Sequence, residues 1–97
     1  MIVSVAVLTI RKGTEKEFLD ILSDYVTREK KVPGCIRVYF KRAMNNDDTY
    51  LIYTEYEDRK ALEASEKISA DAQKAEGGNI EFKLRPFLLK GFYGDFE

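Results

Sequence analysis

The amino-acid sequence predicts an α+β domain whose elements follow one another in the order β-α-β-β-α-β. Two segments, one between Thr14 and Pro33 and one over 59–76, combine helix start signals with apolar residues at helical spacing. Strand-like runs occur before, between and after them, at 2–10, 35–43, 49–57 and 79–85. The chain has 97 residues, the length of one domain, so we expect residues 1–97 to form a single domain.

The first predicted strand, residues 2–10, is apolar on both of its alternating sets of side chains, and such strands are usually buried on both faces. Thr14 and Glu17 then fit a capping box, in which the two side chains accept hydrogen bonds from backbone N–H groups at a helix start. Pro33 and Gly34 stop this helix. Its apolar side consists of Phe18, Ile21, Leu22, Tyr25 and Val26.

Residues 35–43 and 49–57 each alternate between two kinds of side chain, and the polar stretch 45–48 between them is typical of a turn. We therefore expect these two runs to pair as an antiparallel hairpin.

The second helix is predicted over roughly 59–76, capped by Asp58 and ended by Gly77-Gly78. Its apolar face is thin, because it consists of Leu62, Ile68 and several alanines. A thin face lets the helix lie close to a sheet or leaves room for a ligand between them. Residues 79–85 are predicted as the last strand, which Pro86 ends.

This order consists of two strand–helix–strand halves joined by a hairpin. Right-handed crossovers then give a four-stranded antiparallel sheet with both helices on one face, the ferredoxin-like arrangement. The other face would be left open, and the C-terminal arm 86–97 is apolar. We expect a homodimer in which the open sheet faces pack together, with an arm that folds back onto its own domain as the alternative.

Composition narrows the classes of partner. Sixteen basic and seventeen acidic side chains give a net charge of −1, which argues against a nucleic-acid backbone or an anionic membrane surface as partner. The apolar run 2–10 is too short to span a membrane and has no basic region before it. One cysteine excludes an internal disulfide, and we expect a cytoplasmic protein.

The chain contains no histidine and no tryptophan. Nucleophile pairs of the Ser–His and Cys–His type are therefore excluded. Zinc sites built from His and Cys are excluded as well, because one cysteine cannot supply the ligands. We expect neither a metal nor an organic cofactor.

Several short motifs resemble the antibiotic biosynthesis monooxygenase (ABM) domain family. They are Pro33-Gly34-Cys35 at the start of the second strand, and residues 53–58 (YTEYED) followed by Ala61-Leu62. The resemblance covers roughly residues 1–92 and implies a dimeric α+β barrel. It also implies oxidation of a small aromatic or quinol-type substrate with molecular oxygen, without metal or flavin, in a pocket between the helices and the sheet.

The family pattern commonly has a Trp where this chain has Tyr56 and a His where it has Ser65. Tyr56 is therefore the candidate catalytic residue, as a phenol that orients a substrate oxygen, unless it only packs the corner between strand and helix. Ser65 joins the candidate substrate-binding residues, to which strand parity and helical phase add Tyr25, Tyr50 and Thr54.

Two further residues have a structural and a chemical interpretation. Glu55 should point to the sheet face opposite Tyr56, where it is either a general base or the ion-pair partner of Arg37 or Lys83. Cys35 is either a reactive thiol or, without a histidine beside it, a small buried hydrophobe.

Two alternative functions stay open. The missing His and Trp favour a non-catalytic dimer of the same fold that binds a small molecule or another protein. RNA-recognition domains share the element order, but they need a third strand with a basic lead, glycine and stacking aromatics. Residues 49–57 (TYLIYTEYE) contain neither the glycine nor the basic lead, so we expect no binding of nucleic acid.

Overall fold

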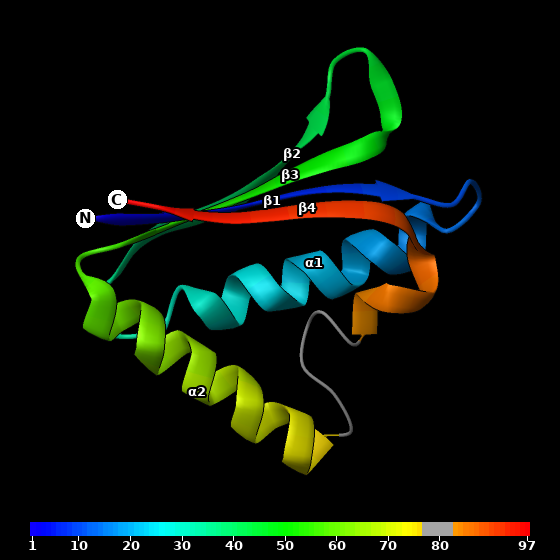
Figure 1. Cartoon of the computed structure of the whole chain (residues 1–97). Helices are drawn as coiled ribbons and strands as arrows, with labels where there is room; N and C mark the ends of the chain where they lie inside the picture. Colours follow the sequence, from blue (N-terminus) through cyan, green and yellow to red (C-terminus); the bar gives the residue numbers. More distant parts are fainter. Residues whose placement is uncertain (77–82) are drawn as a thin grey trace.

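The computed structural model describes residues 1–76 and 83–97, with the side chains of 72–76 excepted. It contains a four-stranded antiparallel sheet in the order β2-β3-β1-β4, with both long helices on one face (Figure 1). This is the ferredoxin-like α+β arrangement that the sequence predicts. The elements are β1 (Ile2–Ile10), α1 (Glu15–Glu29), β2 (Cys35–Ala43), β3 (Asn46–Tyr56), α2 (Arg59–Glu76), the short 3-10 helix η1 (Arg85–Phe87) and β4 (Leu88–Phe96).

The core lies between the sheet and α1. Leu8 and Ile10 of β1 face the helices, and each is 1% exposed. They pack in one cluster with the buried side chains Phe18, Leu22, Tyr50, Ile52 and Leu84. On the other face of β1, Val3 and Val5 are half-buried and Val7 is exposed, so burial on both faces is not achieved within one chain.

The two helix starts differ in how they are capped. Asp58 caps α2 as predicted, because its Oδ1 accepts a hydrogen bond from the Ala61 N–H at 3.0 Å. The capping box predicted for α1 is wrong. The Thr14 hydroxyl donates backwards to the Arg11 carbonyl at 2.6 Å, so Thr14 makes no side-chain cap at the helix start.

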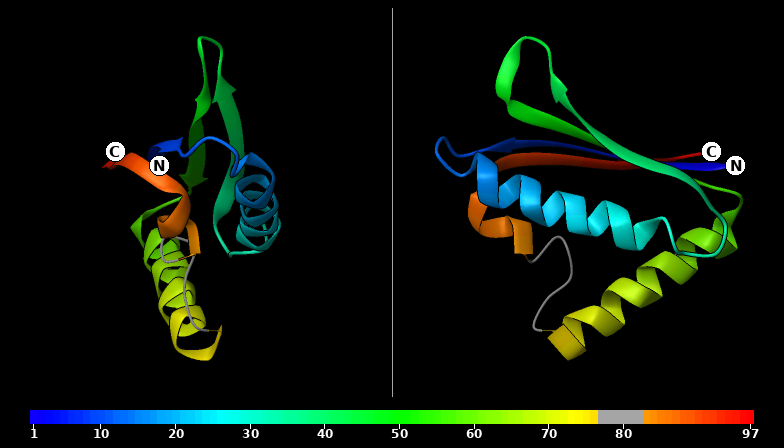
Figure 2. Two further views of the ribbon diagram at one scale, coloured as in Figure 1. Left: turned by 90° about the vertical axis from the view of Figure 1, so that its right-hand side faces the viewer. Right: turned by 180° about the vertical axis from the view of Figure 1, so that it is seen from behind.

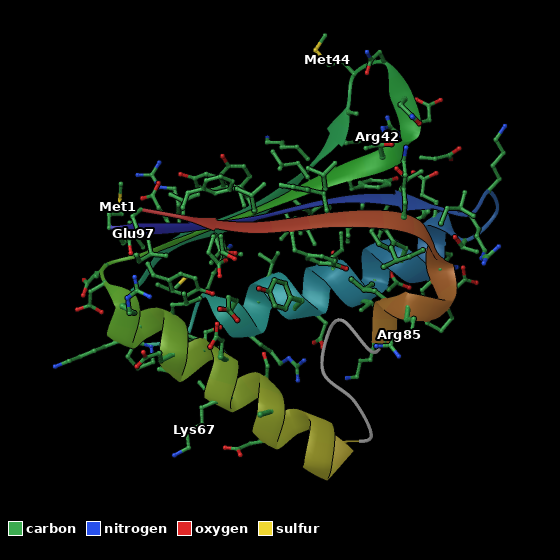
Figure 3. All side chains as sticks on the ribbon, in the orientation of Figure 1. Met1, Arg42, Met44, Lys67, Arg85 and Glu97 are labelled. Atoms are coloured by element: carbon green, nitrogen blue, oxygen red, sulfur yellow. The ribbon has the colours of Figure 1, made fainter. Side chains whose placement is uncertain are left out.

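The hairpin between β2 and β3 is tighter than predicted. Its turn consists of residues 44 and 45, and β3 begins at Asn46 rather than at Thr49. Asn46, predicted as part of the turn, pairs with Ala43 of β2, and its side-chain Oδ1 accepts a hydrogen bond from the Asp48 N–H at 3.0 Å. The hairpin projects beyond the rest of the sheet, with Met44 at its tip (Figures 2 and 3).

The fourth strand is not where the sequence places it. Residues 83 and 84 are helical and lead into η1, and residues 79–82, like the predicted helix end at 77–78, lie outside the described residues. The edge beside β1 is occupied by β4, from the segment expected to be a C-terminal arm. The pattern of 79–85 suits a strand locally, but the more apolar β4 pairs with the apolar β1, and Pro86 fits the first turn of η1.

No helix in the described part of the chain is both long and apolar enough to cross a membrane.

Candidate functional site

Helix α2 leaves the sheet at an angle, so that its first turns lie near β3 and its last turn lies farthest from the sheet (Figures 1 and 2). Between α2, α1 and the sheet is a cavity of about 580 Å³. This volume is in the range of small-molecule sites. The cavity is lined by Ser4, Val5, Ala6, Leu8, Tyr25, Ile52, Thr54, Tyr56, Leu62, Ser65, Glu66, Ser69, Ala70, Leu84, Tyr93, Gly94 and Asp95.

Four of the five site residues predicted from the sequence line this cavity: Tyr25, Thr54, Tyr56 and Ser65. Tyr50 does not. Its side chain is 2% exposed, its ring packs against Phe18 with 5.0 Å between the centroids, and its hydroxyl donates to Glu15 Oε1 at 3.0 Å. Strand parity correctly places Tyr50 on the helix-facing side of the sheet, but α1 fills the space above it.

A buried carboxylate connects the cavity wall to the end of α1. Glu29, the last residue of α1, is only 5% exposed. The Tyr56 hydroxyl donates to Glu29 Oε1 at 2.5 Å, and the Ser65 hydroxyl donates to the same oxygen. The Tyr56 and Ser65 oxygens are 3.1 Å apart. We call these three residues, which come from α1, β3 and α2, the inner cluster.

The environment of the inner cluster keeps Tyr56 protonated. Burial raises the pKa of the Tyr56 hydroxyl well above its usual range, and the hydrogen bond to Glu29 raises it further. No lysine or arginine in the described residues forms an ion pair with Glu29. Among the described residues, the hydroxyl groups of Tyr56 and Ser65 are therefore the groups that satisfy this buried carboxylate.

Sequence reasoning missed Glu29, although a signal was present. Residues Phe18, Leu22, Tyr25 and Glu29 follow one another at spacings of four, three and four, which places them on one helix face. A carboxylate at the end of an apolar stripe indicates a buried, hydrogen-bonded acid. Arg28, Lys30 and Lys31 surround Glu29 in the sequence, and a helix end with this many charges is typical of a solvent-exposed turn.

Two small residues let α2 approach the cluster. Gly34 has φ of +84°, and a Cβ on it would lie 2.5 Å from the Ala61 Cβ, so only glycine fits between this loop and the first turn of α2. Cys35 follows, partly buried beside Tyr56 and Ile2. Burial and the neighbouring Glu29 raise the pKa of the Cys35 thiol, which agrees with its interpretation as a small hydrophobe.

The cavity has an acidic rim. Asp95 and Glu66 line it, and the Ser4 hydroxyl donates to Asp95 Oδ1 at 2.8 Å. The described residues that line the cavity include no lysine or arginine. Within the same described part of the chain, no three His, Cys, Asp or Glu side chains are grouped as metal ligands would be.

A second buried carboxylate lies on the opposite face of the sheet. Glu55 is 8% exposed, accepts a hydrogen bond from the Tyr53 hydroxyl at 2.7 Å and pairs with Arg37 Nε at 3.3 Å. The predicted ion pair with Arg37 is thus confirmed, whereas Lys83 belongs to no strand. We call Arg37, Tyr53 and Glu55 the outer cluster. Tyr39 stacks on Tyr53 with 5.0 Å between ring centroids.

Comparison with known proteins shows the family of the chain and agrees with its fold. The model of the antibiotic biosynthesis monooxygenase (ABM) family matches residues 1–76. The chain belongs to this family. No curated protein matches the sequence significantly.

Solved structures with the same fold include several ABM-type proteins. An antibiotic biosynthesis monooxygenase homologue from Deinococcus radiodurans has a TM-score of 0.85 at 12% identity, covering 100% of this chain and 91% of its own. SnoaB, a cofactor-independent oxygenase from Streptomyces nogalater, has a TM-score of 0.79 at 18% identity, with coverage of 99% and 90%. A conserved protein from Methanosarcina mazei Go1 has a TM-score of 0.82 at 21% identity, with coverage of 99% and 90%. At these identities the likeness shows the fold.

Proposed function

We propose that this ABM-family protein is a monooxygenase that oxidises a small aromatic or quinol-type substrate with molecular oxygen, without metal or flavin. The observation that supports this best is the inner cluster, a buried carboxylate joined by a hydrogen bond to a tyrosine on the wall of a cavity with both polar and apolar lining residues. The volume of about 580 Å³ suits a molecule of two or three fused rings. The family and the oxygenase SnoaB support the reaction type.

The chemistry requires a proton acceptor next to an apolar space. An anthrone or quinol that loses a proton becomes an electron-rich anion, which can transfer one electron to O₂. The substrate radical and superoxide then combine, and the resulting peroxide loses water to give the quinone. For anthrone the sum is C₁₄H₁₀O + O₂ → C₁₄H₈O₂ + H₂O. Tyr56 is the proposed contact with the substrate oxygen, and Glu29 behind it is the proposed final proton acceptor.

Oxygen uptake with a panel of reduced naphthoquinols and anthrones tests this function. We expect protein-dependent uptake, and we expect Tyr56→Phe to lower kcat/KM about a hundredfold, because positioned proton transfer contributes roughly 10²- to 10⁴-fold. Tyr50→Phe is the matched control. It removes a tyrosine hydroxyl from the core outside the cavity, so uptake should stay within about twofold of wild type.

The possible results separate the reaction from the residue. No protein-dependent uptake across the panel would contradict the proposed function. Uptake that is equal in Tyr56→Phe and wild type would keep the reaction and remove Tyr56 from it.

A non-catalytic binding protein is the second candidate. It is favoured by the absence of any histidine or tryptophan in the chain, since the family pattern commonly has a Trp at Tyr56 and a His at Ser65. Saturable binding of the same aromatic compounds without oxygen uptake would select this candidate.

We propose further that the protein forms a homodimer through the open sheet face. By register, Val3, Val5 and Val7 of β1 pair with Phe96, Gly94 and Phe92 of β4 on that face. Phe92 is 58% and Phe96 52% exposed. A continuous apolar face of this kind is unusual on a monomer, and a second copy would cover it. The cytoplasm is the proposed compartment, because a single cysteine cannot form an internal disulfide.

A further inference from the structure

We propose that Glu29 sets the hydrogen-bond polarity of the cavity wall formed by Tyr56 and Ser65, so that this wall takes neutral aromatic molecules that donate a hydrogen bond and discriminates against ethers and carboxylates. This inference rests on the proposal that the cavity is the ligand site. It goes further, because it assigns to Glu29 the choice between donor and acceptor ligands.

Both hydroxyl protons of the inner cluster are taken up by Glu29. A tyrosine or serine hydroxyl has one proton to donate and lone pairs to accept with. Tyr56 and Ser65 both donate to Glu29 Oε1. Neither hydroxyl then has a proton left for a ligand, although both residues line the cavity. At this wall a ligand meets oxygen lone pairs, and a good fit requires the ligand to supply the proton.

The two hydroxyl protons cannot turn toward a ligand at low cost. Glu29 is 5% exposed, and no cation of the described residues pairs with it. A buried carboxylate that loses its donors is strongly destabilised, and hydrogen bonds to an ionised group are among the strongest in proteins. A ligand that needs a donor would therefore have to compete with Glu29 for the same protons.

One hydroxyl group at the rim of the cavity is held in the same way. The Ser4 hydroxyl donates to Asp95, so a third hydroxyl proton is taken up by an acid. Asp95 and Glu66 add negative charge beside the opening, and no lysine or arginine is among the described lining residues. An anionic ligand would be repelled here, and an aromatic hydroxyl would be attracted.

The test uses three air-stable probes with one ring system: 1-naphthol donates a hydrogen bond, 1-methoxynaphthalene only accepts, and 1-naphthoate is an anion. Binding to the full chain is measured by titration calorimetry. We expect wild type to bind 1-naphthol at least about tenfold more tightly than 1-methoxynaphthalene, the ratio given by one hydrogen bond of about 1.4 kcal/mol. Binding of 1-naphthoate should be weaker still.

Glu29→Met replaces the carboxylate by an unbranched apolar side chain and releases both hydroxyl protons. The naphthol preference should then fall to about threefold or less, since the wall can donate as well as accept. Glu63→Met is the matched control, because Glu63 is an exposed acid of the same helix α2 and is not among the described residues that line the cavity. It should leave the ratio of the two affinities unchanged.

Tyr56→Phe gives a second measurement if Glu29→Met does not fold, as judged by circular dichroism. It should weaken binding of 1-naphthol about tenfold and leave 1-methoxynaphthalene within about twofold, because the wild-type hydroxyl accepts from the ligand. A loss that falls on 1-methoxynaphthalene instead would overturn the inference.

Equal affinities for 1-naphthol and 1-methoxynaphthalene in wild type, or a preference that persists in Glu29→Met, would also overturn it. If oxygen uptake is observed at the same time, the proposed function survives and only the role of Glu29 is lost. If none of the probes binds and no substrate consumes oxygen, both proposals fail.

Discussion

Two consecutive residues of β3, Glu55 and Tyr56, belong to carboxylate–tyrosine clusters on opposite faces of the sheet. In the outer cluster the carboxylate of Glu55 accepts from Tyr53 and pairs with Arg37. In the inner cluster the carboxylate of Glu29 accepts from Tyr56 and Ser65. Both carboxylates are nearly buried, at 8% and 5% exposure, so burial alone does not distinguish them.

The difference lies in what compensates the charge. A guanidinium group neutralises Glu55, so this carboxylate is a structural ion pair with little capacity for proton chemistry. Glu29 is compensated by hydroxyl groups, which remain able to pass a proton. A buried carboxylate held by neutral donors beside a cavity is thus the better functional candidate.

The largest expected effect concerns the outer face. If that face is the dimer interface, Val7→Asp places a charge in its apolar centre and should raise the dimer dissociation constant at least about a hundredfold. Sedimentation velocity at several protein concentrations measures this. Ile68→Asp on α2, also an exposed apolar residue but away from the sheet, should leave the dimer intact. If the wild-type chain sediments as a monomer at about 100 micromolar, the proposed interface is ruled out.

Truncating each carboxylate should have unequal effects on stability. Glu29→Ala leaves a small cavity and two buried hydroxyls without their acceptor, and should lower the free energy of unfolding by about 2–4 kcal/mol. Glu55→Ala should cost about 1 kcal/mol or less, because Arg37, with 63% of its side chain exposed, returns to water. Urea denaturation at one protein concentration compares them. Equal losses would mean that the outer cluster is as strongly coupled to the fold as the inner one.

The smallest expected effect concerns tyrosine ionisation. Burial raises the pKa of Tyr56, and the hydrogen bond to Glu55 raises the pKa of Tyr53 on the outer face. A raised pKa favours the protonated side chain in the folded state. Its contribution to stability is therefore complete below the pH at which unfolded tyrosine ionises, about 10, and is lost as the pH rises toward the folded pKa.

Absorbance at about 295 nm measures the ionisation of tyrosine side chains in the folded protein. Tyr53→Phe should reduce the absorbance change before alkaline unfolding, because Tyr53 is the more accessible of the two. Tyr56→Phe should leave that change as it is in wild type. An absorbance change that is smaller in Tyr56→Phe would show that Tyr56 ionises in the fold, against the raised pKa.

The sequence determined the type, order and most of the bounds of the elements. The predicted ranges 2–10, 35–43 and 59–76 agree with β1, β2 and α2 as the structure has them. These elements follow from local information: alternation at a period of two, apolar residues at helical spacing, an aspartate cap and glycine at a turn. The alternation of side chains along the predicted strand is sufficient to place Thr54 and Tyr56 on the helix-facing side of the sheet.

Only the tertiary structure decided which segments meet. β4, rather than the segment predicted at 79–85, pairs with β1 at the edge of the sheet. Which segment pairs there depends on pairing energies between segments that are far apart in the chain, and local sequence patterns do not contain this information. The inner cluster joins residues separated by 27 and 36 positions, and nothing local links Glu29 to Tyr56 or Ser65.

Tyr50 and Tyr56 lie on the same face of β3, but α1 covers Tyr50, whereas the divergence of α2 from the sheet opens a cavity beside Tyr56. Local patterns specify which way a side chain points, whereas the angle at which a helix crosses the sheet determines whether that side chain meets a packed core or a cavity.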